Sequence, residues 1–274
     1  MSRAGSSSRL LPPSPFHDTF PPLAMPSPFH LVRRKSHPHG EQIESDVAQL
    51  RDASLAAVYY ARRRGRGFYD FLRVGPNRVL FALLDCLDGS KENQKLAAAV
   101  RTTFRQVGPQ VFAKEDINLA EAMIEFCLQL NRTLLETADQ TRSCPAFAGC
   151  YEETLSTLWY VNAGHAAALV RDPAGVRELA ATGLPLGLFS HATCDASPLV
   201  FEPGMALLVV SRAGVEAKSG GSEFGLEAVK SEFRQMATTN ASEIGASMLA
   251  RVREFVGRPA NPTNVTALAL ARSR

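Results

Sequence analysis

The pattern of apolar and polar positions changes near residue 55. Beyond this point, short runs rich in aromatic and branched residues predict β-strands. The runs FYDFLRV and RVLFALLD are separated by the turn Gly75-Pro76-Asn77, so they predict a hairpin. Other strands are expected at 55–62, 146–151, 156–163, 167–171, 199–202, 206–211 and 264–271.

Helical spacing of apolar residues predicts four further segments, at 92–107, 117–137, 225–236 and from Asn240 onward. Glu243 follows Asn240 by three residues, which is typical of a capped helix N-terminus. The order is strands, two helices, strands, two helices and a last strand. This order predicts an α+β fold: a four-layer α-β-β-α sandwich, with two antiparallel sheets flanked by helices.

The N-terminal region has a different composition. Residues 1–40 are rich in proline and serine, which predicts a disordered tail. The sequence PSPFH occurs in it twice, either as a duplicated docking motif or as simple low complexity. In 41–54, Ile43, Val47 and Leu50 have helical spacing and predict a leading helix. Residues 55–274 are expected to form one domain.

Composition narrows the possible partners and compartment. A net charge of +3 over 274 residues is too small to indicate a nucleic-acid partner, and we interpret the arginine cluster at 62–66 as a solvated strand end. No apolar stretch of about twenty residues and no signal sequence occur, so we expect no membrane association and a cytoplasmic location. The five cysteines lack redox or zinc spacing and predict reduced, buried thiols.

Four motifs occur in an informative order: FYDFLRVGPNRVLFALLD, LWYVNAGH, GLPLGLF and NVTALAL. In this order and spacing the chain resembles bacterial metal-dependent Ser/Thr protein phosphatases of the PPM (protein phosphatase 2C-like) family. The similarity is to the branch with the sporulation stage-II phosphatase and the phosphatases of sigma-factor regulators. The resemblance spans 55–272 and implies the same four-layer fold.

The resemblance also implies a metal site that this sequence departs from. Members of the family hold two manganese or magnesium ions with aspartates, and a metal-bound water attacks the phosphoserine. Of the four matching positions only Asp85 is an aspartate, with the Cys86 carbonyl beside it as the backbone ligand. The others are Gly67, Arg212 and Asn264.

Loss of these carboxylates leads to the hypothesis of a pseudophosphatase, with no catalytic residue and no bound cofactor. It would act by binding a signalling protein, such as a phosphoprotein of a sigma-factor regulatory system. Arg212 is expected either to form an ion pair with Asp85 or to bind a phosphate. His165 of NAGH is interpreted as a structural residue, with a general-acid role as the other possibility.

Two alternatives remain open at this stage. In the first, Asp70, Asp85, Asp88 and Glu216 form a shifted single-metal site with weak phosphatase activity, because one magnesium needs only one or two carboxylates and several waters. In the second, the protein is an interaction module that recruits partners through its N-terminal tail.

Overall fold

The computed structural model describes residues 34–36, 43–60, 68–85, 91–114, 116–138, 143–191, 193–257 and 265–273. The arginine cluster at 62–66 and most of the predicted tail lie outside these ranges. So do four residues named as candidates for the site: Gly67, Cys86, Asp88 and Asn264.

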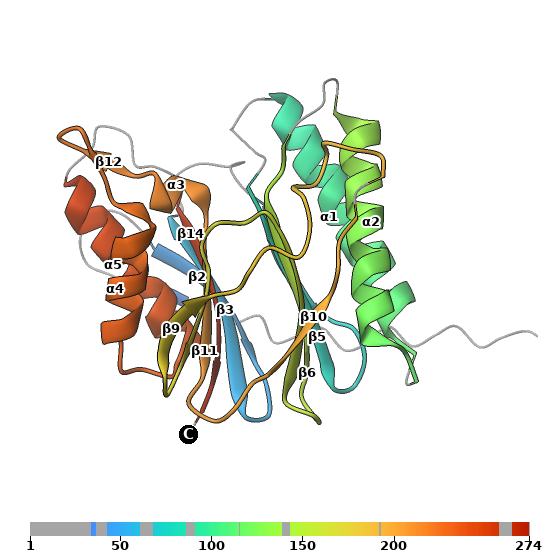
Figure 1. The fold of residues 1–274 in the computed structure, drawn as a ribbon, viewed down its shortest axis with the longest axis horizontal. Coiled ribbons are helices and arrows are strands. Elements are labelled where there is room, and N and C mark those ends of the chain that lie inside the picture. The colour runs from blue at the N-terminus through green and yellow to red at the C-terminus, as the bar shows by residue number, and fades with distance from the viewer. Residues whose placement is uncertain are drawn as a thin grey trace, which may run out of the picture.

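Two antiparallel sheets face each other in the middle of the molecule (Figure 1). The five-stranded sheet has the order β10-β7-β6-β5-β4, with β10 Ser197–Val200, β7 Thr157–Ala163, β6 Ala146–Glu152, β5 Arg78–Leu84 and β4 Phe68–Arg73. The seven-stranded sheet has the order β1-β2-β3-β14-β11-β8-β9. Its strands are β1 Arg34–Ser36, β2 Ile43–Gln49, β3 Ala53–Tyr60, β14 Thr266–Arg272, β11 Ala206–Val210, β8 Ala168–Asp172 and β9 Gly175–Glu178.

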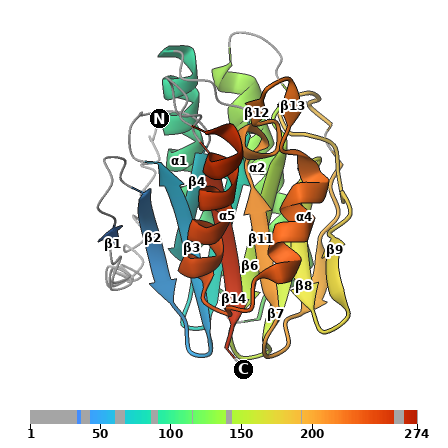
Figure 2. The same ribbon diagram turned by 90° about the vertical axis from the view of Figure 1, so that its left-hand side faces the viewer.

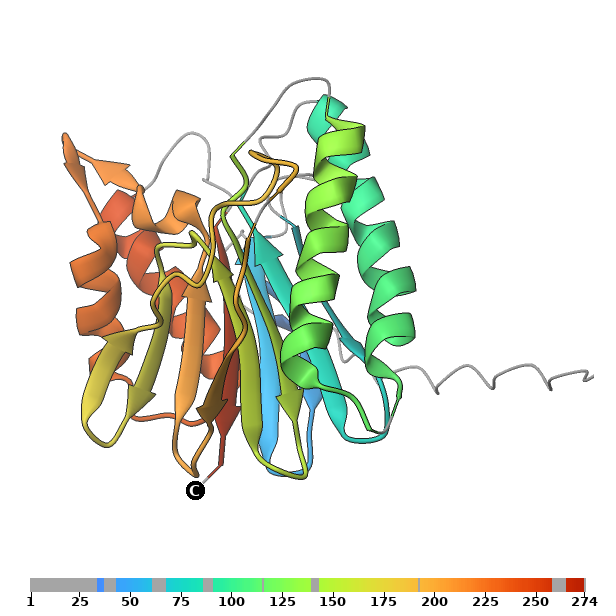
Figure 3. The same cartoon turned by 45° about the vertical axis from the view of Figure 1, so that its right-hand side comes forward.

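Two pairs of helices form the outer layers. The helices α1 Lys91–Phe112 and α2 Leu119–Thr137 run side by side along the five-stranded sheet (Figure 3). The helices α4 Gly225–Gln235 and α5 Ala241–Val256 cover the seven-stranded sheet (Figure 2). The short α3 Arg212–Val215 follows β11, and β12 Lys218–Ser219 and β13 Ser222–Glu223 form a small hairpin after it. This arrangement confirms the predicted four-layer sandwich.

The central strands are buried on both faces, which explains their continuous apolar runs. In β5, Val79, Phe81 and Leu83 pack between the sheets, whereas Leu80, Ala82 and Leu84 pack against α1 and α2. The side chains of β11 likewise alternate between the inter-sheet core and the core under α4 and α5. Each such large side chain contributes about 1.5–3 kcal/mol by leaving water.

The predicted leading helix at 41–54 is wrong, because residues 43–49 form the strand β2. This strand pairs with β3 over its whole length, from Ile43 with Tyr60 to Gln49 with Ser54. A tight turn joins the two, closed by a bond from the Leu50 amide to the Ala53 carbonyl (3.0 Å). Pairing with a neighbouring strand therefore outweighs the helical spacing of three apolar residues.

The predicted tail also contains ordered structure near its end. Residues 34–36 pair with 43–45 as the edge strand β1, so that part of the 1–40 prediction is wrong. The predicted helices at 92–107 and 117–137 are confirmed, as is the helix that begins after Asn240, whose side chain accepts from the Glu243 amide (3.2 Å). Within the described ranges, no helix combines the length and apolar character needed to cross a membrane.

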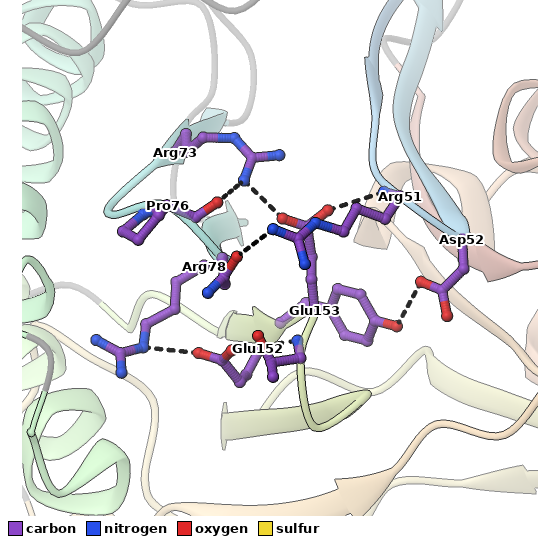
Figure 4. A network of polar contacts seen from close by, with 10 residues as sticks. Arg51, Asp52, Arg73, Pro76, Arg78, Glu152 and Glu153 are labelled. Atoms are coloured by element: carbon purple, nitrogen blue, oxygen red, sulfur yellow. Dashed lines mark hydrogen bonds and ion pairs between the residues drawn. The ribbon is translucent and has the colours of Figure 1, made fainter.

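A network of ion pairs joins the two sheets at the turns β2–β3, β4–β5 and β6–β7 (Figure 4). The fully buried carboxylate of Glu153 accepts from the Arg51 amide (2.9 Å) and from the Arg73 guanidinium (2.6 Å). Its neighbour Glu152 accepts from Nε of Arg78. Nη1 of the same arginine donates to the carbonyls of Phe112 and Lys114 at the end of α1. These turns therefore hold both sheets and one helix together.

Replacing Glu153 by glutamine should destabilise the protein by about 1–3 kcal/mol, since Arg73 and the Arg51 amide lose a charged acceptor. Urea unfolding measures this change. The matched control is Asp172→Asn, which removes an acid from a more exposed pair with Arg177 (3.5 Å) and should change stability little. Equal effects of the two variants would contradict the role given to Glu153.

Candidate functional site

A cavity of about 210 Å³ opens between the sheets at the strand ends opposite the ion-pair network. It lies where β5 and β11 end and α3 begins. The helix α3 is seen at the upper end of the sandwich in Figure 1. Its walls are mainly apolar, with four ionisable side chains among them. The lining residues are Asp85, Pro145, Gly164, His165, Ala166, Ala167, Val210, Arg212, Val215 and Glu216.

Asp85 lies directly after β5, and its side chain is only 9% exposed. Its backbone amide donates to the Pro145 carbonyl (2.8 Å), which continues the pairing of β5 with β6. The carboxylate oxygen Oδ2 accepts a bond from the Arg212 amide (2.6 Å) and lies 3.0 Å from Nε2 of His165. Groups of the protein itself therefore surround this oxygen.

His165 is held in place by the other residues of the NAGH turn. The Asn162 side chain accepts from the His165 amide (2.7 Å) and donates to the carbonyls of His165 (3.1 Å) and Leu179 (2.8 Å). Gly164 has a φ of 71°, and a Cβ there would lie 2.7 Å from Cγ of Pro185. The turn therefore fixes the position of His165 beside Asp85.

The imidazole of His165 is almost completely buried, with 2% of its side chain exposed. Among the described residues, neither ring nitrogen finds a hydrogen-bond partner of regular geometry, although Nε2 lies 3.0 Å from the Asp85 carboxylate. A polar group this deeply buried is usually hydrogen-bonded. The imidazole therefore provides the pocket with a polar group of unused bonding capacity.

The predicted ion pair between Arg212 and Asp85 is wrong. Only the backbone amide of Arg212 bonds to Asp85; the guanidinium is 65% exposed, and its Nε donates to Glu216 (2.6 Å). This hydrogen bond is the main reason that the pKa of Arg212 is raised. The two residues are four apart, which brings their side chains together at the wall of the pocket.

Asp70 does not join Asp85 in a common site. It lies on the same face of β4 as Phe68 and Leu72, which pack in the core under α1 and α2, and it forms a two-fold ion pair with Arg105 of α1 (2.8 Å for each contact). Asp85 instead lines the pocket between the sheets. The alternative site with Asp70 as a ligand is therefore wrong, and Asp88 lies outside the described residues.

The described donors do not fit a pair of divalent cations. Such ions require several anionic oxygens, and among the described residues that line the pocket only Asp85 and Glu216 carry carboxylates. Glu216 is paired with Arg212, and no three His, Cys, Asp or Glu side chains within the described ranges converge on one point. Moreover, the Arg212 amide already donates to the Asp85 oxygen that faces α3.

The cysteines behave only partly as expected. Cys127, Cys150 and Cys194 are free and buried, as predicted. Cys144, beside the pocket residue Pro145, is disulfide-bonded, so the prediction of a reduced thiol is wrong there. The sequence offered no sign of this bond, because the pairing of distant cysteines depends on the fold.

Solved structures of low sequence identity share this fold. The RsbU and RsbW domains of Rv1364c from Mycobacterium tuberculosis match with a TM-score of 0.65 at 20% identity, over 81% of this chain and 60% of that one. The SiaA-PP2C domain of Pseudomonas aeruginosa matches with a TM-score of 0.60 at 15% identity, over 80% and 85%. The phosphatase domain and regulatory fragment of Bacillus subtilis SpoIIE match with 0.59 at 11%, over 88% and 82%.

The two facing sheets, the paired helices and the pocket at the strand ends thus define a PPM-type, protein phosphatase 2C-like fold. No curated protein sequence matches the chain. The family model of stage II sporulation protein E (SpoIIE) matches residues 75–272, which is well over half of the chain. The protein belongs to the SpoIIE family, and this confirms the resemblance drawn from its motifs.

Replacing Asn162 by alanine should destabilise the protein by about 3 kcal/mol, because three buried backbone groups lose their partners. Asn118→Ala is the matched control: this exposed asparagine caps α2, and a lost cap costs about 1 kcal/mol. Urea unfolding of both variants gives the comparison. If Asn162→Ala cost no more than Asn118→Ala, the NAGH turn would not depend on its asparagine.

Proposed function

We propose that this protein is a catalytically degenerate PPM phosphatase that acts by binding a signalling protein. The observation that carries the proposal is the set of contacts made by the Asp85 carboxylate. This sole carboxylate at a family metal position is already bonded to the Arg212 amide and lies beside the buried His165. At the position of the family's third metal ligand, this chain has Arg212 in place of a carboxylate, and its positive charge is balanced by Glu216.

Charge explains why metal-dependent catalysis is disfavoured. A bound water becomes a nucleophile at neutral pH only when concentrated positive charge lowers its pKa. That charge must in turn be held by anionic oxygens, and Gly67, Arg212 and Asn264 supply none. A single weakly held magnesium at Asp85 and Asp88 is the alternative, and it would give a slow phosphatase.

Restoring the three missing carboxylates tests both ideas. The triple variant Gly67→Asp, Arg212→Asp, Asn264→Asp should bind Mn²⁺ at least about tenfold more tightly than the wild type, because affinity follows the charge of the ligand set. Calorimetric titration measures this binding, and p-nitrophenyl phosphate hydrolysis measures turnover. Tight two-site Mn²⁺ binding by the wild-type protein, or steady hydrolysis that EDTA abolishes, would reject the proposal.

The pocket mouth supports a phosphoprotein as the partner. The exposed guanidinium of Arg212 carries donors that match two phosphate oxygens, and it is held by a single surface acid, Glu216. When a phosphate binds at α3, the guanidinium gives up one exposed ion pair with Glu216 and gains a doubly charged partner. Membership of the SpoIIE family supports a phosphoprotein of a sigma-factor regulatory system as this partner.

A phosphoserine peptide should therefore bind without being hydrolysed, and Arg212→Ala should weaken the binding about tenfold, which corresponds to ~1.4 kcal/mol. Glu216→Gln should strengthen it, since the guanidinium loses its competing acceptor. The control is Arg177→Ala, which removes another exposed, ion-paired arginine. Fluorescence anisotropy measures all three variants.

Equal affinity of wild type and Arg212→Ala would exclude the guanidinium as the phosphate ligand. If deletion of residues 1–40 abolished partner capture while Arg212→Ala did not, recruitment through the N-terminal segment would replace recognition at the pocket.

A further inference from the structure

The GLPLGLF segment exposes large apolar side chains on the surface of the five-stranded half of the molecule. Leu184 and Phe189 are 51% and 54% exposed. Together with Leu188, Ser190 and His191 they line an open groove of about 590 Å³. Exposed apolar side chains that gather in one place, next to polar ones, are typical of a surface that binds another protein.

The backbone that carries this groove is fixed by hydrogen bonds. From α2, the buried Asn131 accepts from the Gly187 amide (2.8 Å) and donates to the Phe189 carbonyl (2.9 Å). At the start of the segment, Gly183 forms a bridge with Ala163 at the end of β7. Because the backbone is already in place, a bound partner does not have to order it, which lowers the entropic cost of binding.

The groove segment packs against one wall of the pocket. Pro185 lies so close to the lining residue Gly164 that a Cβ added there would be 2.7 Å from its Cγ. Leu186 exchanges two backbone hydrogen bonds (2.8 and 3.0 Å) with Cys144, which precedes the lining residue Pro145. The groove is therefore continuous with the pocket, on the side formed by the five-stranded sheet.

We propose that this groove receives a large apolar side chain of the same phosphoprotein whose phosphate binds Arg212. The inference rests on the proposed function and adds the chemistry of the residues beside the phosphoserine. Gly164 follows β7 of the five-stranded sheet, whereas Arg212 begins α3 after β11 of the seven-stranded sheet. An extended peptide that crosses the pocket between these walls places its phosphate on one side and an apolar residue on the other.

The lining of the groove determines which side chain it accepts. Among the described residues that form it, none is an acid, a lysine or an arginine, so a charged side chain would lose water without gaining an ion pair. A leucine, methionine or phenylalanine instead buries apolar surface against Leu184, Leu188 and Phe189. The partner is therefore a phosphoprotein with a large apolar residue close to its phosphoserine.

Methyl NMR of the full-length protein locates the contact. Two phosphoserine peptides are compared, one with leucines on both sides of the phosphoserine and one with glycines there. The leucine peptide should shift the methyl signals of Leu184 and Leu188, and the glycine peptide should leave them nearly unchanged. The control signal is that of Leu155, which is 69% exposed in the turn between β6 and β7 and should not move. The leucine peptide without phosphate should shift the same two signals at higher concentration.

Fluorescence anisotropy measures the contribution of the groove to affinity. The leucine peptide should bind about tenfold more tightly than the glycine peptide, because one apolar side chain leaves water. The double variant Leu184→Ser, Phe189→Ser should abolish this ratio. The matched control is Val200→Ser, which removes another exposed apolar side chain, 62% exposed on the edge strand β10, and should preserve the ratio.

Equal affinities of the two peptides, or unchanged Leu184 and Leu188 signals with both forms of the leucine peptide, would overturn the proposal. Contacts of these methyl groups with the PSPFH sequences of the same chain, or a dimer that Phe189→Ser dissociates, would overturn it as well, since the groove would then have another occupant. If Arg212→Ala has no effect while the leucine peptide keeps its advantage, the phosphate ligand of the proposed function is wrong and the groove stands.

Discussion

Burial of the central strands on both faces is the constraint on which the rest of this structure depends. In β11, and in β5 beyond Arg78, every side chain enters a core, either between the sheets or under a helical layer. Burying a polar group there without a hydrogen-bond partner would cost a large part of the free energy of folding. Chemistry is therefore confined to the strand ends, where Asp85 ends one sheet and α3 begins beyond the other.

At those ends the protein supplies its own partners for the carboxylate of Asp85. The backbone amide of Arg212 donates to its Oδ2 and the buried imidazole of His165 lies beside the same oxygen, and both are positioned by rigid local structure: the start of α3 and the NAGH turn. The Arg212 side chain pairs instead with Glu216, at the C-terminal end of α3. The pocket thus combines Asp85 and His165 with a mostly apolar wall and an exposed ion pair.

Much of this could be predicted from the sequence. The strand and helix order, the hairpin before Asp85, the capping at Asn240 and the family all followed from local pattern and motif spacing. Errors arose where a distant partner decides the outcome. The segment 43–49 became a strand because β3 lies beside it, the Arg212 side chain pairs with Glu216 and not with Asp85, and no spacing rule could reveal that Cys144 is disulfide-bonded.

The ion pairs of Glu152 and Glu153 have a wider consequence for how this domain can change over time. They join the strand turns at the end of the sandwich opposite the pocket, because Arg78 begins β5 and Asp85 follows its last residue. The sheets are thus joined at this end by side chains that lie far along the strands from Asp85 and Arg212. Substitutions at the pocket end of the strands therefore leave these ion pairs in place.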